Sequence, residues 1–445
     1  MTTFNNVLNE AKDCVCSWGK KEVLFAVTIV RDVYGKLSFL MDNKESITES
    51  DKDNFTAQMA ERIGSYFSGR IYWKRLSHSQ KSTAEREKFI IQMIEAERES
   101  WDERDEIVFY LSERAIAKKA WIYQREVQES VWPYEEAVSE DGCKVISFYS
   151  FKGGMGRTTA LASVALTLVH QGRNVIMVDM DIEAPGLASL FFDEEVITGG
   201  LLDYLLEHEI DSEMSIDHYL LDVTEPALLD ENSGHLYLMP AGKVDDNYLQ
   251  KLARIDYQDH REGYLRNALA TMLIEIKNTF SVDYLLLDAR AGFHDMGGIA
   301  VTQLPHGVVL FGNDSRQSWD GITQVLRSIA KGHDEDFPLM IVGTMCPNPA
   351  LPAFAAAKEH FIRKSYSICL ENYYNINHEL PGIDAEGELH YPELISYTES
   401  LMQGIELYSD GSQEQNQRVN TYKTILTGES YRKITARIQG WFGEN

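Results

Sequence analysis

Hydrophobic and polar positions follow two different patterns along this chain. In the first part, the apolar runs Val23 to Val30 and Lys36 to Met41 are joined through Asp32 to Gly35, which carries turn-forming residues. This arrangement predicts a β-hairpin. A helical pattern from Ser50 to Phe67 and a short strand pattern from Arg70 to Lys74 follow. We therefore expect the chain to begin with a small α+β unit.

From Thr83 to Val131, apolar residues recur at three- and four-residue spacing, which predicts long helices. These apolar positions are Phe89, Ile90, Met93, Ile94, Ile107, Val108, Leu111, Ala115 and Ile116. The charged segment between them, Glu95 to Glu106, is interpreted as a solvated helical face rather than a docking surface. The polar break from Ser139 to Gly142 marks the predicted boundary. Residues 1–140 then form an N-terminal α+β/helical domain, and residues 141–445 form a second domain.

After the break, short apolar runs alternate with longer helical patterns. The expected strands are Val145 to Tyr149, Asn174 to Asp179, His235 to Met239, Tyr284 to Asp288, Val308 to Gly312 and Leu339 to Thr344. Alternation at this spacing predicts an α/β fold, with a mostly parallel sheet flanked by helices and ligands bound at the carboxyl ends of the strands. The C-terminal region is mainly helical. Its last helix, Tyr431 to Trp441, is expected to pack on the domain rather than lie on a membrane.

Composition and charge exclude several classes of protein. The chain has 44% hydrophobic and 25% charged residues, as an ordinary soluble protein does, and a formal net charge of -27. Such a charge disfavours nucleic acid and anionic membranes as partners. The apolar runs are too short to span a bilayer and the start has no signal-peptide pattern, so the expected location is the cytoplasm. The scattered cysteines, including Cys14 and Cys16, are expected to be reduced thiols.

A glycine-rich turn follows the first strand of the second domain. It reads Phe151-Lys152-Gly153-Gly154-Met155-Gly156-Arg157-Thr158-Thr159 and precedes a helical pattern that begins at Ala160. Successive backbone N–H groups in such a turn, together with the helix N-terminus, form a socket for a phosphate chain. Glycine leaves room for the phosphates and permits positive φ angles. This turn is the predicted nucleotide site.

Two further strands end in carboxylates. One ends in Asp179-Met180-Asp181-Ile182-Glu183, and the other ends in Asp288-Ala289-Arg290-Ala291-Gly292. Phosphoryl transfer requires neutralisation of charge on the phosphate oxygens and a positioned water, with little covalent chemistry by the protein. We expect Thr158, Asp179 and Asp288 to supply oxygen atoms near a Mg²⁺ ion, because hard cations prefer such ligands.

The turn departs from the Walker A pattern G-x-x-x-x-G-K-[ST] at Phe151 and at Arg157. The run from Lys152 to Thr159 nevertheless resembles the deviant Walker A loop of the ParA/MinD-like P-loop ATPases, and its Gly-Arg ending resembles the KGGVGR-motif variant branch. The two acidic strand ends resemble that family's switch I and its Walker B and switch II segments, and Met239 to Gly242 resembles a recurrent strand end. The resemblance extends over about Lys144 to Thr344 and hardly includes residues 1–140.

The resemblance implies ATP and Mg²⁺ as cofactors and a homodimer that closes over the nucleotides. Lys152 would reach phosphates bound by the other subunit, Asp181 would orient the attacking water, and Asp288 would hold Mg²⁺ through water. The predicted catalytic residues are Lys152, Arg157 and Asp181; the nucleotide-binding residues are Gly153, Gly154, Met155, Gly156, Arg157, Thr158 and Thr159; and the metal-binding residues are Thr158, Asp179 and Asp288. Asn313 and Asn348 are both candidates for contact with the base of the nucleotide.

The function predicted from these features is a Mg-ATP-dependent molecular switch. It would bind and hydrolyse ATP, slowly or with stimulation by a partner protein that contacts the N-terminal domain. Two alternatives stay open: a non-catalytic nucleotide-binding scaffold, since Phe151 and Arg157 depart from the pattern, and a DNA-segregation-type ATPase, which the net charge disfavours. Members of the KGGVGR branch are often encoded beside bacterial conflict or signalling genes, so the resemblance also implies a role in antiviral defence or signalling.

Overall fold

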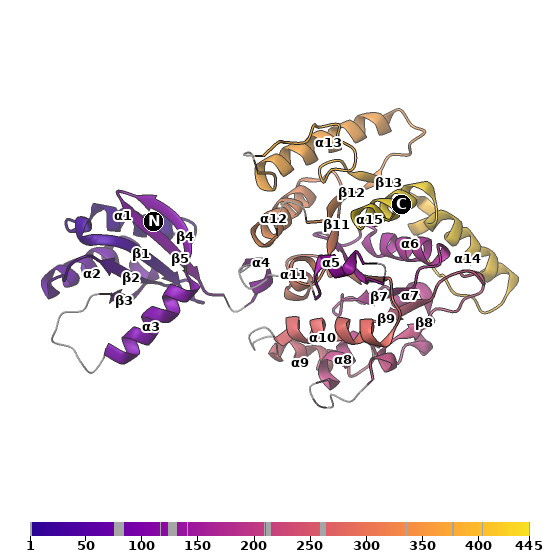
Figure 1. The fold of residues 1–445 in the computed structure, drawn as a ribbon, viewed down its shortest axis with the longest axis horizontal. Helices are drawn as coiled ribbons and strands as arrows, with labels where there is room; N and C mark the ends of the chain where they lie inside the picture. Colours follow the sequence, from indigo (N-terminus) through magenta and orange to yellow (C-terminus); the bar gives the residue numbers. More distant parts are fainter. Residues whose placement is uncertain are drawn as a thin grey trace. The chain divides into compact units, whose positions relative to one another are not determined.

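The computed structural model describes residues 2–444 apart from 75–83, 116, 123–130, 140, 209, 211–214, 259–263, 334–336, 376–377 and 403. The chain divides into two compact units, Met1–Ile116 and Ala117–Asn445 (Figure 1). This division precedes the boundary expected near residue 140, because the segment after Ala117 packs on the second unit. Trp121 donates a hydrogen bond of 2.8 Å from Nε1 to the carbonyl oxygen of His294, and Trp132 donates one of the same length to Cys143.

The first unit is a five-stranded sheet with helices on both faces. Its elements are α1 (Val7–Ser17), β1 (Leu24–Arg31), β2 (Leu37–Asn43), α2 (Glu49–Ile63), β3 (Phe67–Trp73), α3 (Ala84–Glu97), β4 (Glu99–Arg104) and β5 (Ile107–Glu113), in the sheet order β3-β2-β1-β5-β4. Alternate strand residues point to opposite faces. Phe39 therefore packs with α1 and α2, whereas its neighbour Leu40 packs against Ile94 of α3.

The predicted hairpin is confirmed, since β1 and β2 pair antiparallel. The helical prediction is correct for α3 but wrong for the residues after it, because Glu99–Arg104 and Ile107–Glu113 form an antiparallel pair of strands. Asp105 and Glu106 make the turn with positive φ angles of 52° and 63°, as a two-residue hairpin requires. The charged residues of β4 therefore lie on an edge strand, where charge prevents pairing with other sheets.

The second unit is built on an eight-stranded sheet in the order β13-β12-β11-β6-β10-β7-β9-β8. The strands are β6 (Lys144–Ser150), β7 (Val175–Asp179), β8 (Leu221–Asp222), β9 (Leu236–Met239), β10 (Tyr284–Asp288), β11 (Gly307–Gly312), β12 (Leu339–Cys346) and β13 (Glu393–Ser396). All neighbouring strands pair in parallel except β8 and β9. The predicted α/β fold with a mostly parallel sheet is confirmed.

Helices cover both faces of this sheet (Figure 1). They are α4 (Lys119–Ile122), α5 (Tyr134–Ala137), α6 (Arg157–His170), α7 (Ala188–Phe191), α8 (Leu201–Glu207), α9 (Tyr248–Gln258), α10 (Tyr264–Thr279), α11 (Asp295–Thr302), α12 (Arg316–Gly332), α13 (Ala353–Asn372), α14 (Gln413–Leu426) and α15 (Glu429–Trp441). Buried side chains of α10, α11 and α12 join one core, and those of α6, α14 and α15 join the other.

The last helix packs against the body of the second unit, as expected. Ile434 and Ile438 of α15 are fully buried in the same core as the apolar side chains of α6. Among the helices that the structure describes, none is both long and apolar enough to cross a membrane.

Candidate nucleotide site

The glycine-rich turn lies at the carboxyl end of β6, in the middle of the sheet. All residues of β6 are buried, which fixes the start of the turn, and α6 begins at Arg157. Gly154 and Gly156 have φ angles of 74° and 71°, a conformation that favours glycine. A Cβ atom added at Gly153, Gly154 or Gly156 would meet no atom within 4 Å, so the space over the turn is open.

Several backbone N–H groups of the turn are available to a ligand. Within the described residues, the N–H groups of Gly153, Gly154 and Gly156 donate no hydrogen bond to the rest of the protein. Unsatisfied N–H groups in a glycine-rich turn before a helix are the features that bind phosphate. The turn therefore fits the predicted phosphate chain of a nucleotide.

Phe151, which stands where Walker A has its first glycine, faces the protein rather than the open space. Its ring lies 4.8 Å from the ring of Phe293, centroid to centroid. It also fills the space beside Gly321 of α12, where an added Cβ would come within 2.1 Å of the Phe151 ring. This departure from the Walker pattern anchors the start of the turn to α12 and to the segment after β10.

Arg157, which stands where Walker A has its lysine, is turned toward carboxylates. Its Nε lies 2.5 Å from Oδ1 of Asp288, and its Nη2 lies 3.6 Å from Oδ2 of Asp181. The residue is buried at 8% exposure. Burial alone would lower the pKa of Arg157, but the charges of these carboxylates more than offset it and raise the pKa. The guanidinium thus neutralises acidic groups beside the glycine-rich turn.

Thr158 and Asp288 bring two oxygen atoms together at the start of α6. The Thr158 hydroxyl donates a hydrogen bond of 2.7 Å to Oδ2 of Asp288. This pair of hard oxygen atoms is suited to a Mg²⁺ ion that takes its other ligands from phosphate and water. Among the described residues, no three carboxylate, imidazole or thiol groups converge closely enough to hold a metal by themselves. The donor set thus fits Mg²⁺ only together with a phosphorylated ligand.

Asp179 holds the loop that follows β7. Its Oδ1 accepts a 3.0 Å hydrogen bond from the N–H of Asp181, and its Oδ2 accepts bonds of 3.1 Å and 3.0 Å from Gly186 and Leu187. The carboxyl is fully buried and opposite Asp288 in the strand register. Burial and the charge of Asp288 raise the pKa of Asp179. The structure brings Asp179 close to the other predicted metal ligands, with its oxygen atoms engaged by backbone.

A second group of charges, Glu183, Arg290 and His294, links the segments after β7 and β10. Arg290 forms an ion pair with Glu183, and Nε2 of His294 lies 2.7 Å from Oε1 of the same carboxylate. Nε of Arg290 is 4.0 Å from Oδ1 of Asp181. Sequence reasoning assigned no role to Glu183 or His294, although each lies within or just after an acidic motif.

The remaining predicted residues take separate places. Lys152 is exposed, and its ammonium group forms no ion pair with the part of the chain that the structure describes. Met155 is buried, with Sδ 4.0 Å from the hydroxyl of Thr344, and Thr159 is half-buried in the first turn of α6. Lys152 is thus a predicted catalytic residue whose side chain is open to solvent.

The two asparagines that are candidates for contact with the nucleotide base differ in position. Asn313 lines a cavity of about 230 Å³ at the carboxyl ends of β11 and β12, together with Thr344 and Pro347. Asn348 instead accepts a hydrogen bond from the N–H of Ala350 with its side chain, which closes a local turn. Asn313 is therefore the candidate beside a cavity.

Part of the second unit, including the glycine-rich turn, is similar to known proteins. Residues 143–336 match the AAA domain family. The chromosome partitioning protein ParA of Myxococcus xanthus is 27% identical over 145 residues, which are 33% of this chain and 44% of that protein. The second unit contains a ParA/MinD-like P-loop ATPase domain. The match spans less than half the length of the curated relative, so the activity and partners of that whole protein do not transfer with the ParA/MinD-like domain.

Solved structures with some likeness to the chain include two partition proteins and a synthase, each at low sequence identity. A plasmid partition protein from Borrelia burgdorferi has 16% identity and a TM-score of 0.39, covering 62% of this chain and 96% of its own. Cobyrinic acid a,c-diamide synthase from Mycobacterium smegmatis, with bound ADP and magnesium, has 21% identity and a TM-score of 0.37, covering 48% and 79%. A pNOB8 ParA bound to nonspecific DNA has 15% identity and a TM-score of 0.43, covering 67% and 99%.

These TM-scores are too low to carry an argument about this chain. The expectation that nucleic acid is no partner rests on net charge, and the comparisons give it no support.

Proposed function

We propose that this protein is a Mg-ATP-dependent switch whose nucleotide state is set at the glycine-rich turn and passed along the chain to the first unit. The observation that carries the proposal is the position of Asp288 between the side chains of Arg157 and Thr158. Its contacts with a hydroxyl oxygen and with a cation at the start of α6 support a role for this carboxylate in holding a phosphate-bound metal.

The Arg157 guanidinium has two possible anionic partners in this scheme. One is the pair of carboxylates Asp288 and Asp181, which it contacts in the structure. When ATP occupies the turn, the guanidinium leaves Asp288 and donates to phosphate oxygens, since its planar group can bond two of them at once. A Mg²⁺ ion held by Thr158 and Asp288 would neutralise charge on the phosphates. Arg157 would thus respond directly to the nucleotide.

Asp181 and Lys152 complete the proposed chemistry. Asp181 is partly exposed, and burial raises the pKa of its carboxyl, with the nearby charges of Arg157 and Arg290 acting in the opposite direction. Release of Arg157 would free this carboxylate to accept a hydrogen bond from the attacking water. The exposed Lys152 would neutralise phosphates bound by a second copy of the chain, as the family resemblance implies.

The segment that follows the first unit, which includes Lys118 and Trp121, packs on the loop after β10 and on the start of α11. Nζ of Lys118 lies 3.2 Å from Oδ2 of Asp295, and the Trp121 ring lies 5.3 Å from that of Phe293. Gly298 of α11 leaves room for this contact, because an added Cβ would come within 2.8 Å of Nε1 of Trp121. A movement of residues 288–295 would displace this segment, and through it the chain that leads to the first unit.

The dimer is tested by size-exclusion chromatography with light scattering, with a non-hydrolysable ATP analogue and Mg²⁺. We expect the wild type to double in mass and Lys152→Ala to remain monomeric while it still binds the analogue. Arg316→Ala removes a cation that is 95% exposed and that, among the residues the structure describes, pairs only with Asp320, so it serves as the control. A wild type that stays monomeric with the site filled would exclude the closed dimer.

A non-catalytic scaffold is the second candidate, favoured by the close contact between Arg157 and Asp288. If this ion pair persists with ATP bound, Asp288 is not released for the metal and hydrolysis does not occur. Phosphate release distinguishes the two candidates, because the scaffold predicts equal, negligible rates for the wild type and Asp181→Ala. Measurement with and without duplex DNA also tests a partition-type role, and a role in defence awaits a partner that co-purifies with ATP.

A further inference from the structure

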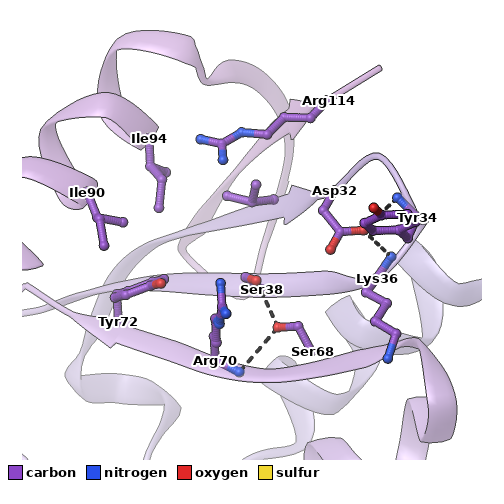
Figure 2. A pocket seen from close by; sticks show the side chains of 11 residues that line it. Asp32, Tyr34, Lys36, Ser38, Ser68, Arg70, Tyr72, Ile90, Ile94 and Arg114 are labelled. Carbon is purple, nitrogen blue, oxygen red and sulfur yellow. Dashed lines mark hydrogen bonds between the residues drawn. The ribbon is translucent and has the colours of Figure 1, made fainter. Parts of the chain in front are cut away.

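The first unit contains a pocket that the proposed ATPase function does not use (Figure 2). It has a volume of about 350 Å³ and lies between the sheet face formed by β1, β2 and β3 and the helix α3. Cavities of this size are at the lower end of the range that binds small molecules. The pocket is therefore large enough for a molecule the size of a mononucleotide and too small for a folded partner.

Cations converge on this pocket although the chain is strongly acidic. Lys36, Arg70 and Arg114 come from different strands or their ends and all line it. Arg114 pairs with Glu97, with Nη2 at 2.8 Å from the carboxylate. Within the described residues, the side chains of Lys36 and Arg70 form no ion pair. Both side chains are exposed, so two cations at the pocket remain available to an anion that enters from solvent.

The carboxylate in the pocket does not cancel these charges by direct pairing. Oδ1 of Asp32 accepts hydrogen bonds of 2.9 Å from the backbone N–H groups of Tyr34 and Lys36. This oxygen therefore holds the turn between β1 and β2 and is not bonded to the Lys36 ammonium. The pocket keeps a positive side toward a ligand.

Hydroxyl groups lie beside the cations. Oγ of Ser38 and Oγ of Ser68 are 2.8 Å apart, and Oγ of Ser68 accepts a hydrogen bond from the N–H of Arg70. Figure 2 shows the Arg70 side chain rising from β3 next to this pair, with Arg114 across the cavity from it. Guanidinium and hydroxyl groups together provide several donors for one phosphate group.

The side of the pocket toward α3 also carries apolar side chains. Ile90 and Ile94 extend from α3 toward the sheet, and Tyr72 lies below them on β3 (Figure 2). A free phosphate would leave this surface uncovered, whereas a planar, weakly polar group could pack against it. The two sides together match a molecule with a phosphate at one end and a ring at the other.

We propose that this pocket binds a small phosphorylated molecule with a planar ring, of the size of a nucleoside monophosphate. The phosphate contacts Arg70 and Lys36, and the ring packs on Tyr72 and Ile90. This site is separate from the glycine-rich turn of the second unit and does not depend on the function proposed there. It gives the first unit a ligand of its own.

The experiment is calorimetric titration of the full chain with the four ribonucleoside 5′-monophosphates, inorganic phosphate and adenosine. We expect at least one monophosphate to bind more tightly than either fragment. Arg70→Ala should weaken this binding about tenfold or more, because a charge-assisted hydrogen bond is lost. Lys20→Ala, which removes an exposed cation of the same unit outside the pocket, should leave it unchanged. Hydrogen exchange should show protection in Phe67–Trp73 on binding.

Thr158→Ala separates the two sites, since it alters the second unit only and should leave this binding unchanged. The proposal is overturned if no monophosphate binds at millimolar concentration. It is also overturned if adenosine binds as tightly as the monophosphates, if Arg70→Ala binds like the wild type, or if Thr158→Ala abolishes binding. Thermal unfolding of Arg70→Ala checks that the exposed substitution has left the first unit folded.

Discussion

The Arg157→Ala substitution tests the electrostatic arrangement of the candidate nucleotide site. The guanidinium is 9% exposed and the Asp288 side chain is 2% exposed, so both members of the ion pair are shielded from water. Removal of one partner from a buried pair leaves the other charge uncompensated, which costs about 3 to 5 kcal/mol. Asp181 and Asp179 add to this cost, because both lie near enough to Arg157 to affect its pKa.

We therefore expect Arg157→Ala to lower the free energy of unfolding of the nucleotide-free protein by about 3 to 5 kcal/mol. Urea denaturation, followed through the transition of the second unit, measures this loss. The matched control is Arg316→Ala, whose side chain is 95% exposed and whose removal should change stability by less than about 0.5 kcal/mol. The double variant Arg157→Ala/Asp288→Asn should be more stable than Arg157→Ala, since it also removes the stranded charge. A loss below about 1 kcal/mol for Arg157→Ala would refute the reasoning.

Three further substitutions test separate parts of the account. Gly321→Ala places a Cβ 2.1 Å from the Phe151 ring, so we expect a lower melting temperature and weaker ATP binding by calorimetry, and an unchanged protein would contradict this packing. Gly298→Ala brings a Cβ within 2.8 Å of the Trp121 indole and should lower stability by about 1 to 3 kcal/mol in urea, whereas no loss would contradict that contact. Burial lowers the pKa of His306 to about 4, so the folded protein holds this side chain neutral. The same imidazole binds a proton in the unfolded chain below about pH 6.5, so the free energy of unfolding should fall between about pH 6.5 and 4. Above about pH 6.5 this residue should not change the stability. His306→Gln should remove that part of the pH dependence, and an identical profile for the variant would refute the assignment.

The sequence predicted the second unit better than the first. Apolar runs such as Tyr284 to Asp288 are buried on both faces of a parallel sheet, and their continuous hydrophobicity makes them easy to recognise. The spacing predicts a helix over Ile107–Glu113 because its apolar residues recur at three- and four-residue intervals. Ile107 to Tyr110 also alternate in burial, as residues of a strand between β1 and β4 do. The turn at Asp105 and Glu106 carries no glycine or asparagine that would have marked a hairpin.

The site shows a similar division between local and long-range features. The glycine-rich turn and the acidic strand ends are each contiguous in the sequence, so the sequence alone allowed both to be proposed as parts of a nucleotide site. The pairing of Arg157 with Asp288 and the packing of Phe151 on Gly321 join residues that are far apart in the chain. A single sequence contains no record of such pairs, so it could not tell whether the two departures from the Walker pattern were defects or contacts.

The most direct test of the proposed switch is phosphate release from Mg-ATP by the purified full chain, compared with Asp181→Ala. The proposal predicts release by the wild type that requires Mg²⁺, and a loss of about 100-fold or more in Asp181→Ala, because the residue that orients water is gone. Calorimetry should show that both proteins still bind ATP. Equal rates in the two proteins, with ATP bound to each, would contradict the central claim that this site is a hydrolysing nucleotide switch.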